Sequence, residues 1–133
     1  MADYSSTPLA RKLGIADGHS VMFIGAPDGF LQSLEPLPDV RIRRRVAAGL
    51  DVVVVFATRG ADLDRQLDRL VPALAPAGGL WVAWPKKAAK VATDLDFTIV
   101  QELGLGTGLV DNKSCSIDDV FQALRFVRRL RDR

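Results

Sequence analysis

The chain has 133 residues, of which 48% are hydrophobic and 26% charged, and its formal net charge is +2. These values predict one globular domain spanning residues 1–133, and the predicted elements described below make it an α/β domain. No run of about 18 apolar residues suggests a membrane-spanning helix. The small net charge argues against a general nucleic-acid-binding protein, whose affinity would depend on neutralising many phosphates. Because residues 1–8 lack the basic start and apolar stretch of a secretion signal, we expect a cytoplasmic protein without membrane contacts.

The first predicted element is a short helical arm within residues 1–14. Thr7 can cap a helix, Pro8 suits the first helical position and Gly14 suits a C-terminal stop. We expect about one and a half turns of helix between them.

An apolar run over residues 20–24 predicts a buried strand that enters a tight loop. In this loop, Asp28 suits the N-cap of a following helix of about two turns, which Pro36 and Pro38 end. Residues 40–50 fit both an edge strand and a helix, and we favour a short strand.

Residues 51–56 contain four consecutive valines and a phenylalanine, which indicates a central strand buried on both faces. An amphipathic helix follows after Gly60, and Pro72 should loosen its last turn. Residues 76–79 should end this segment before a second buried strand over residues 80–84. A strand, a helix and a strand with short turns predict a right-handed parallel crossover.

The last third of the chain predicts a helix and two strands. Asp94 or Asp96 can begin the helix, and glycines from Gly104 onward interrupt it. Residues 109–117 and 123–128 read as an antiparallel pair at the edge of the sheet.

The expected ligand site lies at the carboxyl ends of the parallel strands, where open α/β sheets bind their ligands. Three turns lie at this edge of the sheet. Their backbone amides and cationic side chains favour an anionic ligand, whose flat apolar part could lie against an indole ring. The candidate ligand-binding residues are Gly25, Asp28, Gly29, Thr58, Arg59, Trp84, Lys86 and Lys87. Each has a structural alternative: the glycines can serve the turn, Trp84 can pack in the core, the lysines can be solvated, and Arg59 can pair with Asp62.

Catalytic and metal-binding groups are not expected. His19 precedes the first strand, at the edge opposite the candidate site, and Cys115 reads as a buried thiol without partners for zinc. Four carboxylates fall at predicted helix starts, where capping explains them: Asp94, Asp96, Asp118 and Asp119. We therefore expect no catalytic residue and no metal site.

Three segments, residues 21–30, 51–58 and 74–84, resemble the Rossmann-like methyltransferases. Within the last segment, residues 75–82 are similar to the turn before the fifth strand of those enzymes, and the closing pair of strands looks like their final hairpin. The resemblance implies a three-layer, mainly parallel sheet with an antiparallel C-terminal hairpin, as in a truncated methyltransferase.

The whole chain also resembles a family of short bacterial proteins of this kind, a domain of unknown function, for which the resemblance implies no activity. This second match rests on residues 6–9, 84–87 and 124–129.

Three departures separate the sequence from the enzyme pattern. Pro27 removes an amide donor from the first loop, and Arg43, Arg44 and Arg45 stand where the enzymes usually carry a carboxylate that accepts hydrogen bonds from the ribose. The stretch between Arg45 and the central strand is also too short for a further helix and strand. S-adenosylmethionine is therefore not the expected cofactor.

The sequence leaves three functional hypotheses. The first is a non-catalytic module that binds an anionic small molecule or a protein partner, with self-association through an exposed edge strand as one form of partnership. The second is a reduced methyltransferase that uses Asp28 or Thr58 near its substrate. The third is a nucleic-acid accessory protein acting through two arginine clusters, residues 41–45 and 125–133, which otherwise read as solvated surface.

Overall fold

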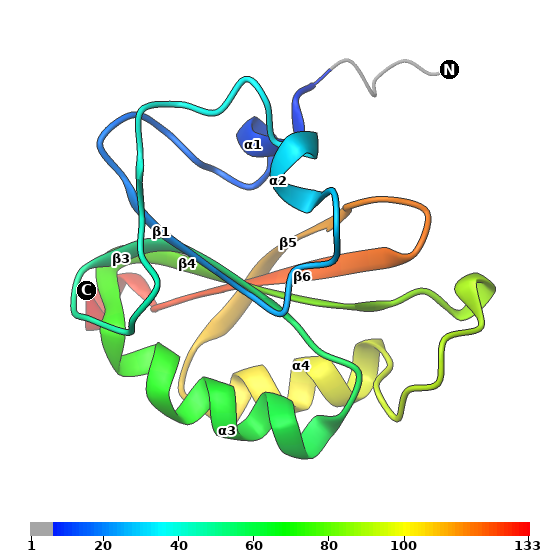
Figure 1. Ribbon diagram of the computed structural model, residues 1–133. Coiled ribbons are helices and arrows are strands. Elements are labelled where there is room, and N and C mark those ends of the chain that lie inside the picture. The colour runs from blue at the N-terminus through cyan, green and yellow to red at the C-terminus, as the bar shows by residue number, and fades with distance from the viewer. Residues whose placement is uncertain (1–6) are drawn as a thin grey trace.

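A computed structural model describes residues 7–133 and contains one six-stranded sheet (Figure 1). The strands are β1 (Ser20–Ile24), β2 (Arg41–Ile42), β3 (Leu50–Phe56), β4 (Leu74–Pro85), β5 (Val110–Ser116) and β6 (Phe121–Val127). Their order is β2-β1-β3-β4-β6-β5; the first four are parallel, and β6 is antiparallel to both β4 and β5. The predicted α/β class and the antiparallel C-terminal hairpin are confirmed.

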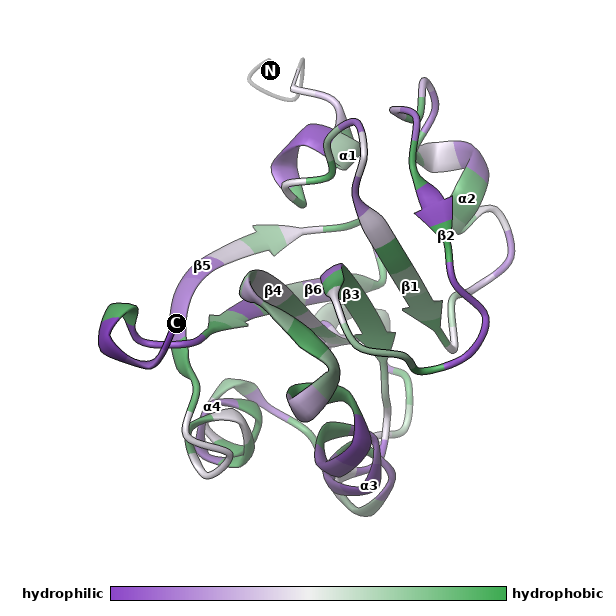
Figure 2. Ribbon diagram, turned by 90° about the vertical axis from the view of Figure 1, so that its left-hand side faces the viewer, coloured by the Kyte–Doolittle hydropathy of each residue, from purple (hydrophilic) through white to green (hydrophobic). Residues whose placement is uncertain are grey.

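Helices cover both faces of the sheet. The helices α3 (Gly60–Leu70) and α4 (Phe97–Leu105) lie on one face, whereas α1 (Leu9–Lys12) and α2 (Phe30–Ser33) lie on the other (Figures 1 and 2). Within residues 7–133, no helix combines the length and apolar character needed to cross a bilayer.

The valine run of β3 serves both faces at once. Val53 and Val55 belong to the core under α3 and α4, while Val52 and Val54 belong to the core under α1 and α2. Because successive strand residues point to opposite faces, a strand covered on both sides is apolar at every position. This explains why four consecutive valines occur in the centre of the chain.

The helix α1 is bound to the sheet rather than being a free arm. Its N-cap is Pro8, one residue later than predicted, and Thr7 makes no capping bond. Leu13 is fully buried, and its carbonyl accepts a hydrogen bond from Nε1 of Trp81 at 2.9 Å. Residues 1–6 of the predicted arm, including Ser6, lie outside the described residues.

The loop after β1 differs from the prediction at Asp28. The N-cap of α2 is Gly29, with φ of 85°, and no side chain caps the helix, so Asp28 lies exposed in the loop. The left-handed backbone at Gly29 makes the turn directly. The helix α2 forms only one turn, and Phe30 at its start and Leu34 at its C-cap are both buried.

The segment over residues 40–50 contains the favoured short strand. The two residues of β2 pair in parallel with β1, while residues 43–49 form neither helix nor strand. The connection from β2 to β3 is therefore a single loop, as the short spacing predicted.

The parallel crossover from β3 to β4 through α3 is confirmed, and Pro72 lies in a 3₁₀ turn (Val71–Ala73) that ends α3. The predicted stop over residues 76–79 is wrong, because β4 begins at Leu74. A wide bulge absorbs the extra residues, since Leu50 pairs with Leu74 whereas Val52 pairs with Gly79. A side chain at Gly78 would place its Cβ 2.6 Å from the carbonyl oxygen of Leu50, so the close strand approach requires glycine there.

The arginine Arg128 holds this bulge in place. Its guanidinium donates hydrogen bonds to the carbonyls of Val71, Leu74 and Ala75 at 2.9, 3.0 and 3.0 Å. One member of the C-terminal arginine cluster, read as solvated surface, is therefore a structural anchor.

The predicted capping carboxylates act at three different places. Asp96 caps α4 by accepting from the backbone N–H of Ile99 at 2.8 Å, whereas Asp94 accepts from Gly60 at the start of α3 at 2.8 Å. Asp118 is not at a helix start. Its carboxylate accepts from two backbone N–H groups in the turn between β5 and β6.

The hairpin and the end of α4 also refine the prediction. β6 begins at Phe121, two residues earlier than expected, and lies between β4 and β5, so only β5 is an edge strand on that side. Gly104 does not end the helix. It lies inside α4, where the Phe126 ring packs directly against its backbone.

Candidate functional site

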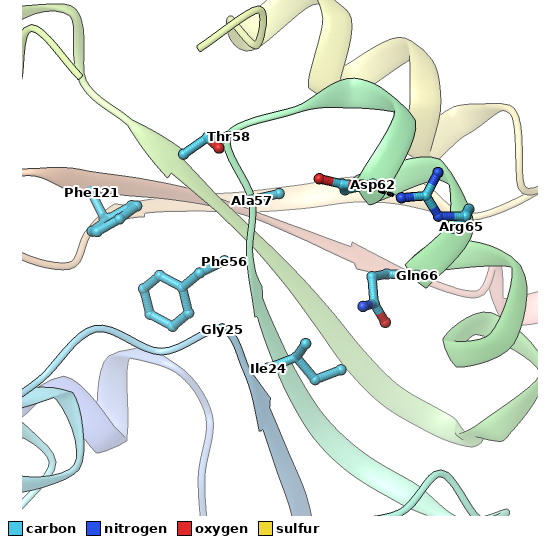
Figure 3. Close-up of a pocket in the computed structure, with 9 residues that line it drawn as sticks. All are labelled: Ile24, Gly25, Phe56, Ala57, Thr58, Asp62, Arg65, Gln66 and Phe121. Carbon is cyan, nitrogen blue, oxygen red and sulfur yellow. Dashed lines mark hydrogen bonds and ion pairs between the residues drawn. The ribbon is translucent and has the colours of Figure 1, made fainter. Parts of the chain in front are cut away.

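A cleft of about 410 Å³ opens where β1 and β3 end. These two strands are neighbours, and the chain continues from β1 to one side of the sheet and from β3 to the other. They therefore form the topological switch point, the usual ligand position of open α/β sheets. We call this the switch-point cleft, and Figure 3 shows its lining: Ile24, Gly25, Phe56, Ala57, Thr58, Asp62, Arg65, Gln66 and Phe121.

Aromatic rings form one side of the cleft. Phe56 and Phe121 meet edge to face with centroids 5.1 Å apart, and Phe30 meets Phe56 from the other side at 5.0 Å. Phe56 is 8% exposed and Phe30 is buried, so this packing holds the rings in place. The result is a fixed apolar surface against which a flat group can lie.

Polar groups from α3 form the opposite side. Arg65 donates to the carboxylate of Asp62 in an exposed ion pair, and Gln66 Oε1 accepts from Arg69 Nε at 2.8 Å. The Thr58 hydroxyl and Gln66 Nε2 have no hydrogen-bond partner among residues 7–133. Since the guanidinium has five N–H donors, Arg65 also retains donors beyond its bond to Asp62. The cleft therefore offers unused donors, with the second carboxylate oxygen of Asp62 as an acceptor beside them.

Gly25 lines the cleft through its backbone. Its φ is 69°, and a Cβ at this position would lie 3.0 Å from the carbonyl oxygen of Phe56. Both the turn and the close approach to β3 therefore require glycine. The residue shapes the rim of the cleft irrespective of any ligand.

Only two of the eight candidate ligand-binding residues, Gly25 and Thr58, line the switch-point cleft. Gly29 is exposed in the loop before α2, as Asp28 is. Arg59 is also exposed, and it lines a separate cavity of about 230 Å³ with Thr58 and the segment around Asp94.

The remaining three candidates lie around the end of β4. Trp84 is only 2% exposed and packs against Phe97 with ring centroids 6.3 Å apart, so its indole belongs mainly to the core. Lys87 is exposed and, with Trp84, lines a third cavity of about 300 Å³. Lys86 Nζ donates to Ser116 Oγ at 2.7 Å and to the Asp118 carbonyl at 2.6 Å, which ties β4 to the hairpin turn.

Seven lining residues were not anticipated as site residues: Ile24, Phe56, Ala57, Asp62, Arg65, Gln66 and Phe121. The three from α3 follow an i, i+3, i+4 spacing immediately after the central strand, and this spacing places side chains on one helix face. That pattern was visible in the sequence. Phe121 was missed because β6 was expected to begin two residues later.

The two reactive side chains considered from the sequence lie away from the cleft. His19 Nδ1 accepts from the backbone of Ala16 at 3.2 Å, before the start of β1. Cys115 on β5 is half-buried; burial raises the pKa of its thiol, and the positive charge of Lys12 partly offsets this effect. Among residues 7–133, no three histidine, cysteine or acidic side chains are grouped to hold a metal ion.

No protein-family model matches the sequence, and no curated protein matches it at the sequence level. The predicted resemblance to a family of short bacterial proteins therefore stays a prediction.

The fold is that of S-adenosylmethionine-dependent methyltransferases. The O-methyltransferase NcsB1 from neocarzinostatin biosynthesis, solved with S-adenosylmethionine and 2-hydroxy-5-methyl naphthoic acid, matches with a TM-score of 0.67 and 15% identity over 96% of this chain and 53% of that chain. A methyltransferase from Aquifex aeolicus matches with a TM-score of 0.62 and 12% identity over 89% and 86% of the two chains. The mitomycin 7-O-methyltransferase MmcR matches with a TM-score of 0.60 and 13% identity over 84% and 49%. The chain thus spans about half the length of the two O-methyltransferases, and the likeness shows the fold alone.

The residues at this edge of the sheet do not fit the adenosyl group of S-adenosylmethionine in the way that the resemblance to Rossmann-like methyltransferases implies. Exposed arginines, Arg43 to Arg45, follow β2 where a ribose-binding carboxylate is expected, and no element over residues 43–49 walls an adenine pocket. The space above Gly25 is taken by the Phe56 backbone, and Pro27 offers no N–H. No methyl-transfer step follows from this arrangement.

Proposed function

We propose that this protein is a methyltransferase-like module that binds a small molecule in the switch-point cleft without transferring a methyl group. Its ligand would carry one apolar ring system and one anionic, acceptor-rich group such as a carboxylate. The observation that carries the proposal is the placement of a fixed aromatic surface opposite unused hydrogen-bond donors at the switch point of the sheet.

The ring of the ligand is placed by Phe56 and Phe121. Their edge-to-face contact leaves an apolar surface on this side of the cleft, and a planar group gains both buried area and ring contacts there. A polar ligand would leave this side of the cleft without partners.

The anionic group is placed by donors. The Thr58 hydroxyl and Gln66 Nε2 line the same cleft together with Arg65, whose N–H groups beyond its bond to Asp62 can turn toward a bound carboxylate. Asp62 neutralises Arg65 in the free protein, so the ligand must compete for that guanidinium. We therefore expect modest affinity.

The size of the cleft limits the ligand. A volume of about 410 Å³ lies near the lower end of the roughly 300–1,000 Å³ range of small-molecule sites. This favours a compound with one or two fused rings over an extended cofactor.

A reduced methyltransferase is the competing function, because the similar O-methyltransferase NcsB1 was solved both with S-adenosylmethionine and with S-adenosyl-L-homocysteine. In that case S-adenosyl-L-homocysteine would occupy the cleft. The anionic-ligand proposal predicts that this compound binds more weakly than an aromatic carboxylate.

Isothermal titration calorimetry with benzoate, indole-3-acetate and S-adenosyl-L-homocysteine tests the proposal. At least one carboxylate should bind saturably at one site. Arg65→Gln should lower the affinity for this carboxylate by only about fivefold, because solvent weakens a charge-assisted hydrogen bond from an exposed side chain. Arg59→Gln is the matched control, because this exposed arginine lies six residues earlier and outside the cleft; its affinity should be unchanged.

Two results would overturn the proposal. One is the absence of saturable binding by either carboxylate, and the other is equal loss of affinity in Arg59→Gln and Arg65→Gln. Tighter binding of S-adenosyl-L-homocysteine than of both carboxylates would favour the reduced methyltransferase instead.

A further inference from the structure

A second surface, formed by β5, β6 and the turn after β6, combines cations with an exposed leucine. Arg125 on β6 lies diagonally across from Gly79 on β4. A Cβ at Gly79 would fall 2.4 Å from Arg125 Nε and 2.8 Å from its guanidinium carbon, so the glycine provides the space in which the guanidinium lies against the sheet.

No acceptor satisfies this guanidinium within residues 7–133. Arg125 makes neither a hydrogen bond nor an ion pair with the described residues, although it is half-buried. Burial and the nearby charge of Arg133 both lower its pKa. A half-buried cation without an acceptor loses hydration that nothing in this part of the chain replaces.

The neighbours of Arg125 increase its positive potential. Lys113 on β5 is its direct cross-strand partner, and Arg133 is close enough to act on its charge. Like charges directly opposite each other on a sheet are destabilising. An external anion bound between these cations would offset their mutual repulsion.

Two acidic groups on neighbouring segments, one on β5 and one in the C-terminal turn, are engaged elsewhere. Asp111 accepts from Gln101 on α4 at 3.3 Å, and Asp132 lies 3.9 Å from Arg131. Neither reaches Arg125. The charge of this surface is therefore not balanced by those two carboxylates.

An exposed apolar side chain follows Lys113 and Arg125 in the chain, in the turn that ends at Arg133. Leu130 is 80% exposed, the highest value among the large hydrophobic residues described, and its carbonyl accepts from the backbone N–H of Arg133 at 3.3 Å. It lies in a 3₁₀ turn (Leu130–Asp132) that follows β6. Figure 1 places this end of the chain beside the start of β4, away from the ends of β1 and β3.

We propose that this surface docks an acidic protein segment in which carboxylates flank an apolar side chain. We call it the C-terminal basic surface, formed by Lys113, Arg125, Leu130 and Arg133. The carboxylates would pair with the guanidinium and ammonium groups, and the apolar side chain would cover Leu130.

The observations favour a protein partner over a nucleic acid. An exposed leucine gains from apolar contact, which a phosphate backbone does not supply. The proposal is independent of the switch-point cleft, because the two sites share no residue.

Fluorescence anisotropy with the full chain and two labelled probes tests the proposal. One probe is a peptide of six glutamates with a central leucine, and the other is a single-stranded DNA of twelve thymidines. We expect the peptide to bind more tightly than the DNA, and Arg125→Gln to weaken the peptide about five- to tenfold because it removes the desolvated cation. Leu130→Ser should weaken it about threefold.

Arg44→Gln serves as the control, since Arg44 is exposed in the loop after β2 and lies outside this surface. Its peptide affinity should match the unmodified chain. Because Leu130 is so exposed, Leu130→Ser should keep its fold, so an effect there is not an unfolding effect. Tighter binding of the DNA, undetectable peptide binding, or unchanged peptide affinity in both Arg125→Gln and Leu130→Ser would overturn the proposal.

Discussion

Replacing Gly104 by alanine should destabilise the protein, although alanine is the better helix former. In a solvent-exposed helix this change would stabilise by about 1 kcal/mol. Here the added Cβ would lie 2.0 Å from Cε1 and 2.2 Å from Cζ of Phe126, whose ring is fully buried. Neither α4 nor β6 can yield without disturbing the core, and overpacking of this kind typically costs about 1–3 kcal/mol or more.

The net expectation for Gly104→Ala is a loss of about 2 kcal/mol, which for a domain of this size lowers Tm by roughly 5–10 °C. Urea denaturation followed by circular dichroism measures the free energy, and calorimetry measures Tm. Gly106→Ala is the control, because it is exposed and its Cβ would meet only helix carbonyls at 3.3 and 3.5 Å. Phe126→Leu should lower the free energy of unfolding less in a chain that already carries Gly104→Ala than in the unmodified chain. A neutral or stabilising Gly104→Ala would refute the packing described for α4.

Three further changes probe other parts of the fold. Arg128→Met should lower the free energy of unfolding by about 2–4 kcal/mol in urea titrations, since it leaves three carbonyls without their donor, whereas the exposed Arg129→Gln should change it by less than about 0.5 kcal/mol. Asp94→Ala should cost about 1 kcal/mol and increase amide exchange at Gly60, because the capping bond comes from 34 residues away in the chain; unchanged exchange there would contradict this. Burial raises the pKa of the Cys115 thiol, so the folded state favours the protonated thiol. The contribution of the thiol to stability is present below its ordinary pKa of about 8.5 and is lost as the pH rises through the raised value. Cys115→Ala should therefore lose less stability than the unmodified chain as the pH is raised above about 8.5, and equal losses would contradict this.

The main features of the fold could be predicted from local patterns. The valines of β3 indicated a strand covered on both faces, and the crossover to β4 followed from chain connectivity. Pro72 was expected to loosen the last turn of this helix, and it lies in the 3₁₀ turn that ends α3. These elements depend on residues close together in the sequence.

The prediction failed where distant segments decide the conformation. Gly78 and Gly79 look like a turn, yet β4 continues through them because β3 and Arg125 approach their backbones closely. Gly104 looks like a helix terminator, yet it accommodates a ring from β6. Asp94 was expected at the start of α4 and instead caps α3. A glycine or a capping residue in the sequence does not show which distant partner it serves.

The candidate site was predicted in position more accurately than in composition. The carboxyl edge of the sheet does carry a cleft, and Gly25 and Thr58 line it. The sequence could not show that Trp84 is buried or that Lys86 is bound to the hairpin turn. The first depends on how α4 packs on the sheet, and the second on where the turn between β5 and β6 lies.

The central claim, that the switch-point cleft is the ligand site, is tested most directly by ¹H–¹⁵N NMR titration with the aromatic carboxylate that binds best. Saturable shifts should concentrate on the amides of Gly25, Ala57, Thr58 and Gln66. Shifts centred on the amides around Trp84 and Lys87, or on none that saturate, would contradict the account.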